Sequence, residues 1–513
     1  MPLNIDFILR LLAAMKSTPI LTEPKRTLLL DFIRAALLFS LLLLFYQRAL
    51  HGGLLFDDDR HLTPQSLRSF AGLWRIWFEP GAAFQYYPVL HSFYWVEQSL
   101  WQDWLPGYHW TSLLLHLGSA LLLVALMRRL ALPGAWIAAF IFALHPVSVE
   151  SVAWISEQKN TLSTFFYLAS ALVYLRFDRS RNRGTYFTAT LLFLLALLSK
   201  TVTATLPGAL WVIFWWQRGR LDCRKDALPL LPWWITGAAG GLFSGWMERH
   251  LYHATGGVFT LTFPQHLLLA AQEILFYIGK LLWPVNLMFH YPIWKISLSD
   301  GWLHLIGLMA LLGFFGWIAR WNRGPLAALL FFVGTLFPVL GFFNIAWFNL
   351  SYVADHFAYL ASLGVIVPVS VGLGVALRQS WLIRGPAVLC VISLVLVLCG
   401  LTWKHCPVFS DMELLYRDTL ERNPDSSMAH FNYGLVLIKM RNRLPEALSE
   451  FRTALELRSN DEEMNVCVAK ILLDTRQNPE EAIAHLEAAL RINPKNPDAL
   501  ALLELARKLR IQD

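Results

Sequence analysis

Three consecutive aspartates stand where a long apolar run ends. The string LLFDDDRHL places Asp57, Asp58 and Asp59 directly after a stretch long enough to cross a bilayer. Ionised side chains at the edge of a span are costly unless water, partners or a ligand meet them, which makes these three a candidate site. A carboxylate there could take a proton from an acceptor hydroxyl and make its oxygen nucleophilic. The alternatives are a solvated loop and a helix N-cap.

Three further polar clusters fall at the ends of other apolar runs, in the strings HPVSVESVAWISEQKN, LLSKTVTATLP and SYVADHFAYL. Glu150 and Glu157 are seven residues apart, so they share one face if their helix continues. A lysine at a span end usually only snorkels to the interface, but four polar clusters on one side of a membrane indicate a common site. The candidates outside the first cluster are His145, Glu150, Glu157, Lys159, Lys200, Asp355 and His356, with Arg249 in a loop between them.

The composition places most of the chain in a membrane. Of 513 residues, 56% are hydrophobic, 14% aromatic and only 15% charged, a balance that excludes a string of ordinary soluble domains. A helix needs about 20 mainly apolar residues to cross a bilayer, and somewhat fewer inside a bundle. Eleven ranges are predicted as spans: 27–50, 108–127, 133–152, 161–177, 186–199, 201–216, 227–247, 301–319, 325–343, 356–377 and 385–403.

Short basic loops orient these spans, because positively charged loops stay cytoplasmic. Lys25 and Arg26 precede the first span, and Arg128 and Arg129 follow the second. We predict that residues 1–26 form a cytoplasmic surface helix. The range 264–284, which Gln272, Glu273 and Lys280 interrupt, is predicted as an interfacial or re-entrant helix. Eleven crossings then put residues 404–513 on the outer side, opposite the N-terminus.

The charge and cysteine patterns argue against a nucleic-acid-binding, a disulfide-rich or a zinc-binding protein. The net charge of +7 comes from basic residues in short loops, which is topology rather than a stripe that follows nucleic-acid phosphates. The five cysteines are scattered without a CxxC pair, so neither a disulfide framework nor a zinc site is indicated. No HxxxH or HExxH spacing supports histidine-bound zinc.

The last hundred residues form a repeat. From residue 411 the pattern recurs every 35 residues, so that Tyr416, Phe451 and Leu486 coincide. Small residues at fixed positions let antiparallel helices approach closely, and Asn-Pro ends the second helix of a pair. We predict a tetratricopeptide-repeat-like solenoid with a leading half repeat, two full repeats and a final helix from Asp498. An unrelated pair of helical hairpins is the alternative. Such an array either binds an extended peptide or acts as a rigid spacer.

Nine strings together resemble the transmembrane and tetratricopeptide-repeat O-mannosyltransferases, in the GT-C glycosyltransferase superfamily. They are FDDD (56–59), YYPVLH (86–91), GYHWTSLLLH (107–116), HPVSVESVAW (145–154), SEQKNTLSTFF (156–166), LLSKTVTATLP (197–207), LLWPVNL (281–287), ADHFAYL (354–360) and YRDTLERNPDS (416–426). The resemblance runs along nearly the whole chain. It implies an all-α fold: a polytopic GT-C-type bundle over residues 27–403, followed by an extracytoplasmic repeat domain over 404–513 in a bacterial inner membrane.

The resemblance also implies an activity. It predicts an inverting transfer of a sugar from a polyprenyl-phosphate donor to a protein Ser or Thr hydroxyl, on the outer face of the membrane, with the repeats engaging the acceptor. No nucleic acid takes part. By this resemblance an acid of the first outer loop acts as the catalytic base, and the family's paired acids, our catalytic candidates, fall on Asp57 and Asp58, with Asp59 outside the pair. No cofactor is required by this chemistry; three aspartates could hold Mg²⁺ or Mn²⁺, but a metal-free reaction is favoured. We assign phosphate binding to Lys200, Arg249, His356 and Lys159, and support to Glu150, Glu157, His145 and Asp355.

The chain departs from the family pattern at two strings. Where the family reads ERKD, this chain has Glu157-Gln158-Lys159-Asn160, and where it reads ADRYTYLP, His356 replaces the arginine. Arg249 or Lys280 could compensate. The departures keep two alternatives open, a non-catalytic scaffold descended from an enzyme and a lipid-sugar transport or assembly partner.

Overall fold

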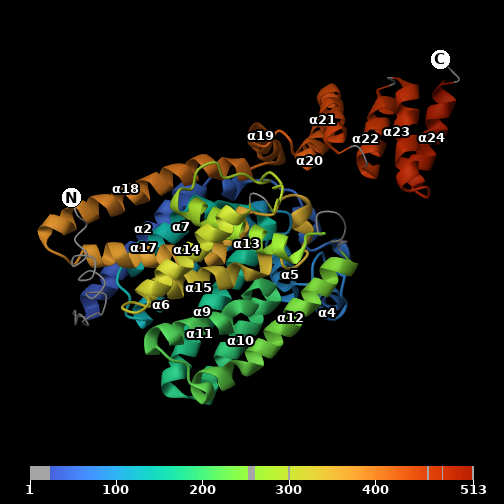
Figure 1. Ribbon diagram of the computed structural model, residues 1–513. Coiled ribbons are helices and arrows are strands. Elements are labelled where there is room, and N and C mark those ends of the chain that lie inside the picture. The colour runs from blue at the N-terminus through green and yellow to red at the C-terminus, as the bar shows by residue number, and fades with distance from the viewer. Residues whose placement is uncertain (1–23, 252–259, 299–300, 459–460, 476–477, 511–513) are drawn as a thin grey trace. The chain divides into compact units, whose positions relative to one another are not determined.

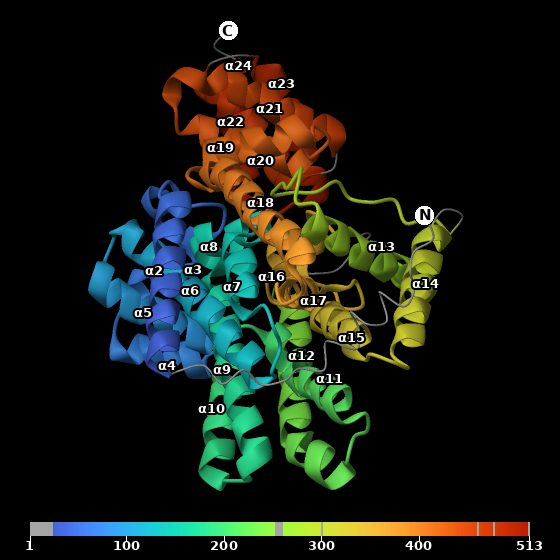
Figure 2. The ribbon, with the colours of Figure 1, turned by 90° about the vertical axis from the view of Figure 1, so that its left-hand side faces the viewer.

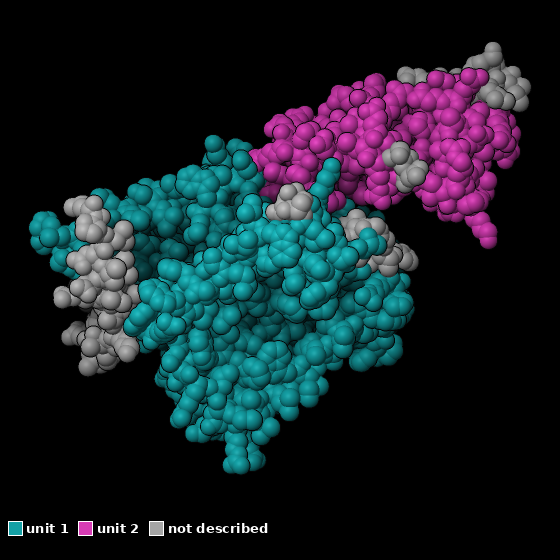
Figure 3. Space-filling view, viewed as in Figure 1, with its two compact units in different colours: residues 1–287, 294–410 teal, residues 288–293, 411–513 magenta. Residues whose placement is uncertain are grey.

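The computed structural model describes residues 24–251, 260–298, 301–458, 461–475 and 478–510, and within them the chain is helical without a strand (Figure 1). It divides into two compact units, one of residues 1–287 and 294–410 and the other of residues 288–293 and 411–513 (Figure 3). The longer segment of the second unit begins at Asp411, after α18 has ended at His405 and a short 3₁₀ turn has followed it. The predicted surface helix over 1–26 lies outside the described residues, except where α2 begins at Pro24.

Every range predicted as a span is occupied by a helix or by a broken helix. The helices of the first unit are α2 (Pro24–Tyr46), α3 (Asp58–His61), α4 (Phe70–Phe78), α5 (Pro88–Trp101), α6 (Leu105–Arg129), α7 (Ala135–Leu144), α8 (Val149–Ala153), α9 (Gln158–Ser180), α10 (Arg183–Ser199), α11 (Leu206–Arg218), α12 (Leu231–His250), α13 (Phe263–Leu282), α14 (Trp302–Ile318), α15 (Gly324–Leu336), α16 (Ala358–Ala361), α17 (Leu363–Ala376) and α18 (Trp381–His405).

Length and hydropathy support fewer crossings than the eleven predicted. Three helical stretches of the described chain, at 28–46, 105–129 and 381–409, are long and apolar enough to cross a membrane, and two bent helix pairs raise the number to five. The helices at 183–199, 302–318 and 324–339 are apolar but shorter. A membrane protein is indicated, while eleven crossings and their orientation stay a prediction.

Two of the predicted spans are broken. The range 133–152 bends by 56° between α7 and α8, where Pro146 cannot continue the hydrogen-bond ladder. The range 356–377 bends by 54° between α16 and α17. The α8 helix ends at Ala153 and Trp154 is extended. Glu150 and Glu157 therefore do not lie on one face of a continuous helix, which is what their seven-residue spacing would have given if the helix had continued.

Helix α9 organises the interior of the first unit. It packs against both α6 and α10, and its first turn is buried (Figure 2). Close helix contacts depend on glycine. A Cβ on Gly134, at the start of α7, would lie 2.0 Å from the Ser370 carbonyl oxygen of α17, and one on Gly374 would lie 2.5 Å from the Gly134 nitrogen.

The second unit is a helical repeat. Its helices are α19 (Met412–Arg422), α20 (Ser427–Ile438), α21 (Leu444–Leu457), α22 (Glu462–Asp474), α23 (Pro479–Ile492) and α24 (Pro497–Arg510). This is the predicted order of a half repeat, two full repeats and a final helix. Five helices begin at side-chain N-caps that satisfy backbone N–H groups of their first turn, supplied by Asp411, Ser426, Asp461, Asn478 and Asn496.

The 35-residue period marks the core of this unit. Tyr416, Phe451 and Leu486 are all buried. A Cβ on Gly434 would lie 2.7 Å from the Phe451 ring, so α20 and α21 pack at a distance that only glycine permits. Small residues therefore let the helices of each repeat approach, as the pattern predicted.

Candidate functional site

Asp58 lies at the start of α3 and is fully buried. Its Oδ1 accepts hydrogen bonds from the Ser156 N–H at 2.7 Å and the Ser156 hydroxyl at 2.5 Å, and its Oδ2 accepts one from the Leu55 N–H at 2.8 Å. Burial raises the pKa of Asp58 to about 7, against the opposing effect of these donors. The carboxylate therefore ties the first loop to the segment before α9, and it is not a solvated loop residue.

Asp57 has a different environment from its neighbour. Its Oδ2 lies 3.5 Å from His61 Nε2, while its buried Oδ1 has no hydrogen-bond partner among the described residues. Burial alone would raise the pKa of Asp57, but the contact with His61 and the positive charge of Lys159 lower it below its usual value. The side chain makes no N-cap hydrogen bond to α3. Asp57 is thus an ionised carboxylate with one uncommitted oxygen, and Asp59 is exposed.

Glu157 is the centre of a buried charge network. Its Oε1 lies 2.8 Å from Lys159 Nζ, and its Oε2 lies 3.3 Å from Lys200 Nζ. Asn160 donates to Glu157 Oε2 at 2.6 Å and accepts from Lys200 Nζ at 2.7 Å. Burial alone would raise the pKa of Glu157, but the neighbouring His356, Lys159 and Lys200 lower it well below its ordinary value.

The two lysines differ in their charge balance. Burial opposes the charge of Lys159, but Glu157 and Asp57 outweigh it and raise the pKa of this ammonium. For Lys200 burial dominates, and its pKa falls to about 8. Lys200 occupies the single position between α10 and the following 3₁₀ turn at residues 201–205, so two helical elements fix its place.

His356 joins the network from the far end of the sequence. Its backbone N–H donates to Glu150 Oε2 at 2.9 Å, and its Nδ1 lies 2.9 Å from Glu150 Oε1. The Nε2 atom lies 3.9 Å from Glu157 Oε1. Glu150 therefore orients the imidazole toward Glu157. The four polar clusters of the sequence are brought together here on α3, α8, the start of α9, the end of α10 and the turn before α16.

Other predicted residues lie differently. His145 is held by backbone, because its Nε2 lies 3.1 Å from the Leu281 carbonyl oxygen and its Nδ1 accepts from the Val147 N–H. Asp355 is buried beside His356 in the same 3₁₀ turn. Arg249 is exposed in the last turn of α12 and forms no ion pair with the network among the described residues. Lys280 donates to the carbonyl oxygens of residues 285 and 286.

Several contributors were not predicted. Ser156 supplies two of the three donors to Asp58, and Glu248 lies within electrostatic range of Lys159. Gln158, where the related family has arginine, donates to both oxygens of buried Glu97 at 3.1 and 3.2 Å. The only signal for Ser156 was its place beside Glu157 in the string ISEQKN, which does not reveal a partner 98 residues away.

The space beside the network is small. A cavity of about 10 Å³ is lined by Asn160, Lys200 and His356, with apolar side chains such as Phe357 and Leu360 around them. This volume holds about one water molecule. Among the described residues, no three His, Cys, Asp or Glu side chains come together as a metal site.

Comparison with known proteins finds two kinds of similarity. Residues 413–462 match the tetratricopeptide repeat family. Protein O-mannosyl-transferase F38B6.6 of Caenorhabditis elegans is 23% identical over 434 residues, which cover 78% of this chain and 59% of the relative. Protein O-mannosyl-transferase TMTC1 of Homo sapiens is 25% identical over 380 residues, which cover 63% and 42%. The chain spans about half the length of the curated relatives it matches.

Comparison with solved structures supports no further conclusion about the fold. A chain in the crystal structure of the APC/C hetero-tetramer Cut9-Hcn1 matches with a TM-score of 0.21 at 14% identity, covering 68% of this chain and 85% of that chain. A score this low carries no argument about the fold. The resemblance that the sequence motifs predicted is confirmed at modest identity: this chain is similar to proteins named O-mannosyl-transferases, and its second unit carries tetratricopeptide repeats.

Proposed function

We propose that this protein is a membrane glycosyltransferase that moves a sugar from a polyprenyl-phosphate donor to a Ser or Thr hydroxyl of a protein. The names of its relatives support sugar transfer and make mannose the first sugar to test. The observation that carries the proposal is the buried network, in which Asp57 keeps a carboxylate oxygen without a hydrogen-bond partner among the described residues within electrostatic range of Lys159, while Glu157 joins Lys159 to Lys200.

The reaction is a single inverting displacement. The Asp57 carboxylate takes the proton of the acceptor hydroxyl, and the hydroxyl oxygen attacks the anomeric carbon. The bond between that carbon and the phosphate oxygen breaks, and polyprenyl phosphate leaves with the electron pair. Lys200 and Lys159 stabilise the charge on the leaving group, which needs no metal. We assign Asp58 to positioning the loop, because both of its oxygens already accept hydrogen bonds, whereas Asp57 keeps one oxygen without a partner among the described residues.

The first unit is a GT-C-type bundle in a bacterial inner membrane with this site on the outer side, and the repeats bind the acceptor protein. The buried side chains of the network support this setting, because charges at membrane depth are retained mainly where substrate or protons are handled.

The test compares three single variants of the full chain in a mannosyl-transfer assay with polyprenyl-phosphate mannose and a serine-rich peptide. Asp57→Asn should lower turnover by about 10²–10⁴-fold with donor affinity unchanged, since it removes the general base. Asp59→Asn, an exposed neighbour with the same charge change, should keep full turnover. Turnover of Asp57→Asn equal to that of Asp59→Asn would contradict Asp57 as the general base, and no turnover by the native chain, as expected of a scaffold, would contradict the enzyme proposal.

A further inference from the structure

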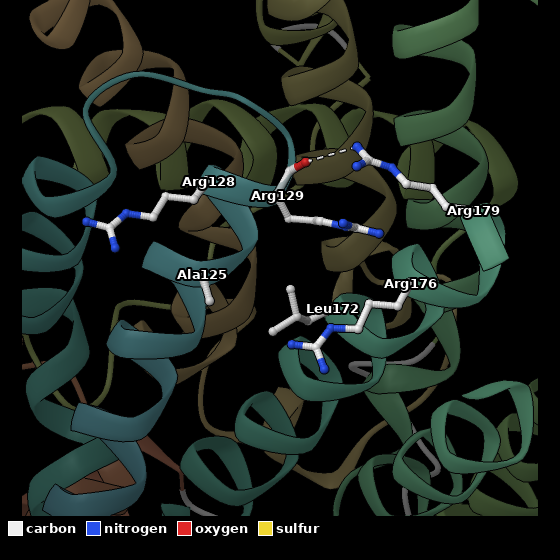
Figure 4. A pocket seen from close by; sticks show the side chains of 6 residues that line it. All are labelled: Ala125, Arg128, Arg129, Leu172, Arg176 and Arg179. Atoms are coloured by element: carbon white, nitrogen blue, oxygen red, sulfur yellow. Dashed lines mark hydrogen bonds between the residues drawn. The ribbon is translucent and has the colours of Figure 1, made fainter. Parts of the chain in front are cut away.

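A second cluster of basic side chains surrounds a cavity of about 360 Å³ between the ends of α6 and α9 (Figure 4). This is within the size range of small-ligand pockets, and it shares no residue with the network described above. Arg128, Arg129, Arg176 and Arg179 line it, together with Ala125 and Leu172.

One of the four arginines is neutralised by an acid. Arg128 makes two hydrogen bonds of 2.6 and 2.7 Å to Asp31, and Figure 4 shows its guanidinium directed away from the other three. The nearby acid Asp178 pairs with Arg181 and Arg218. Among the residues that the structure describes, no carboxylate forms an ion pair with Arg129, Arg176 or Arg179.

Two of the three remaining arginines are held by backbone carbonyl oxygens rather than by opposite charge. Arg129 donates to the Leu175 carbonyl oxygen at 3.1 Å, and its buried Nε has no hydrogen-bond partner among the described residues. Arg179 reaches the Arg129 carbonyl oxygen at 3.5 Å. Two helix C-termini together supply about one negative charge, which is less than three guanidinium groups require. The pocket therefore keeps an excess of positive charge.

The pocket is apolar at one end and cationic at the other. Ala125 and Leu172 each lie four residues before a lining arginine, hence one helical turn further into α6 and α9. Helix α6 is one of the helices apolar enough to cross a membrane, and its last turn carries Arg128 and Arg129. Such an arrangement fits a phosphate held at the level of lipid headgroups, with an apolar portion below it.

We propose that the pocket formed by Arg129, Arg176 and Arg179 binds a phosphate ester. Guanidinium groups suit this ligand because they donate paired hydrogen bonds to phosphate oxygens. Its source is either the headgroup of an anionic phospholipid or a soluble phosphate. The proposal is independent of the proposed transferase activity, and its test needs no turnover.

The experiment measures phosphatidylglycerol bound to the full chain in detergent by native mass spectrometry, with phosphatidylcholine as the neutral lipid. The paired change Arg176→Gln with Arg179→Gln should weaken phosphatidylglycerol binding by about tenfold or more. The matched control, Arg183→Gln with Arg220→Gln, removes the same charge from exposed positions outside the pocket and should bind as the native chain does. Equal binding by the two double variants would overturn the site in favour of a diffuse basic surface.

A third variant tests whether binding needs the space of the pocket as well as its positive charge. Leu172→Trp keeps every arginine but fills the pocket, so it should also weaken binding; retention of native affinity would overturn the proposal. This variant carries the test alone if the double arginine variant fails to fold. Competition by millimolar inorganic phosphate supports the site and assigns it to soluble phosphate, whereas retention of the lipid supports the site and assigns it to the headgroup.

Discussion

The two units use charge in opposite ways. In the first unit, Glu157 and Lys159 pair with only 2% and 8% of their side chains exposed. In the repeat unit, the Arg452–Glu481 pair of 2.6 Å links neighbouring repeats with 48% and 27% exposed. Removing two charges from water costs several kcal/mol per ion, whereas an exposed pair costs little. The repeats thus derive stability from apolar packing, while the first unit maintains a costly network that stability alone does not require.

The largest effect expected from this contrast is that of Glu157→Gln. The change leaves Lys159 and Lys200 buried without their shared carboxylate, which should destabilise the first unit by about 3–5 kcal/mol. All 22 tryptophans lie at or before Trp403, so thermal unfolding followed by tryptophan fluorescence reports on this unit alone. Asp59→Asn removes an exposed acid from the same unit and should leave the midpoint unchanged. Equal unfolding midpoints for the two variants would mean that losing the Glu157 carboxylate does not destabilise the first unit more than losing an exposed acid.

Next in size is a change in the apolar core of the repeats. Phe451→Ala removes a fully buried ring that packs on Gly434, which should cost about 3–4 kcal/mol in the second unit. The half-buried thiol of Cys467 on α22 reports on opening of this unit, through its alkylation rate measured by mass spectrometry of its own peptide. We expect faster alkylation with an unchanged tryptophan midpoint. A lowered tryptophan midpoint would show that the two units do not unfold independently.

A smaller effect is expected from a change in pH, on the binding of the sugar donor. The pKa of Lys200 is lowered to about 8, so its positive charge is present below pH 8 and lost as the pH rises through that value. If Lys200 holds donor phosphate, binding of a fluorescent polyprenyl-phosphate sugar should weaken by about tenfold between pH 7 and pH 9. Lys200→Arg stays charged throughout and should flatten the profile. The same profile in both proteins would remove Lys200 from the donor site.

The smallest effect belongs to the exposed pair of the repeats. Arg452→Ala should destabilise the second unit by about 0.2–1 kcal/mol, in line with other surface ion pairs. The Cys467 alkylation rate should rise only slightly, and 0.5 M salt should abolish the difference from the native chain. A loss as large as that from Phe451→Ala would contradict the distinction between the two units.

The repeat unit was largely predictable because its signal is local and periodic. Tyr416, Phe451 and Leu486 recur at one spacing, and each is buried at an equivalent place. The apolar ranges of the first unit likewise become helices. Their breaks were harder to predict, since the range 133–152 is apolar enough for one helix and only Pro146 indicates the bend.

The partners within the candidate site could not be read from spacing. Asp58 meets Ser156 across 98 residues, and Glu150 meets His356 across 206. The sequence predicted that polar clusters converge, because each lies at a helix end, but a single sequence does not determine which atoms meet. His145 was predicted as a site residue, but its ring forms hydrogen bonds with backbone groups at the bend instead of joining the network.

The Gln158–Glu97 contact has a consequence for how the interior tolerates charge. Burial raises the pKa of Glu97 to about 8 against the opposing effect of the neutral donors of Thr111 and Gln158, so at neutral pH this carboxyl group is mostly protonated. An arginine at position 158, as in the related family, would favour its ionisation. The guanidinium would bring one positive charge and the acid would release one proton, so the swap would be electroneutral. A lineage could therefore exchange glutamine and arginine here repeatedly without leaving an unbalanced ion in the protein.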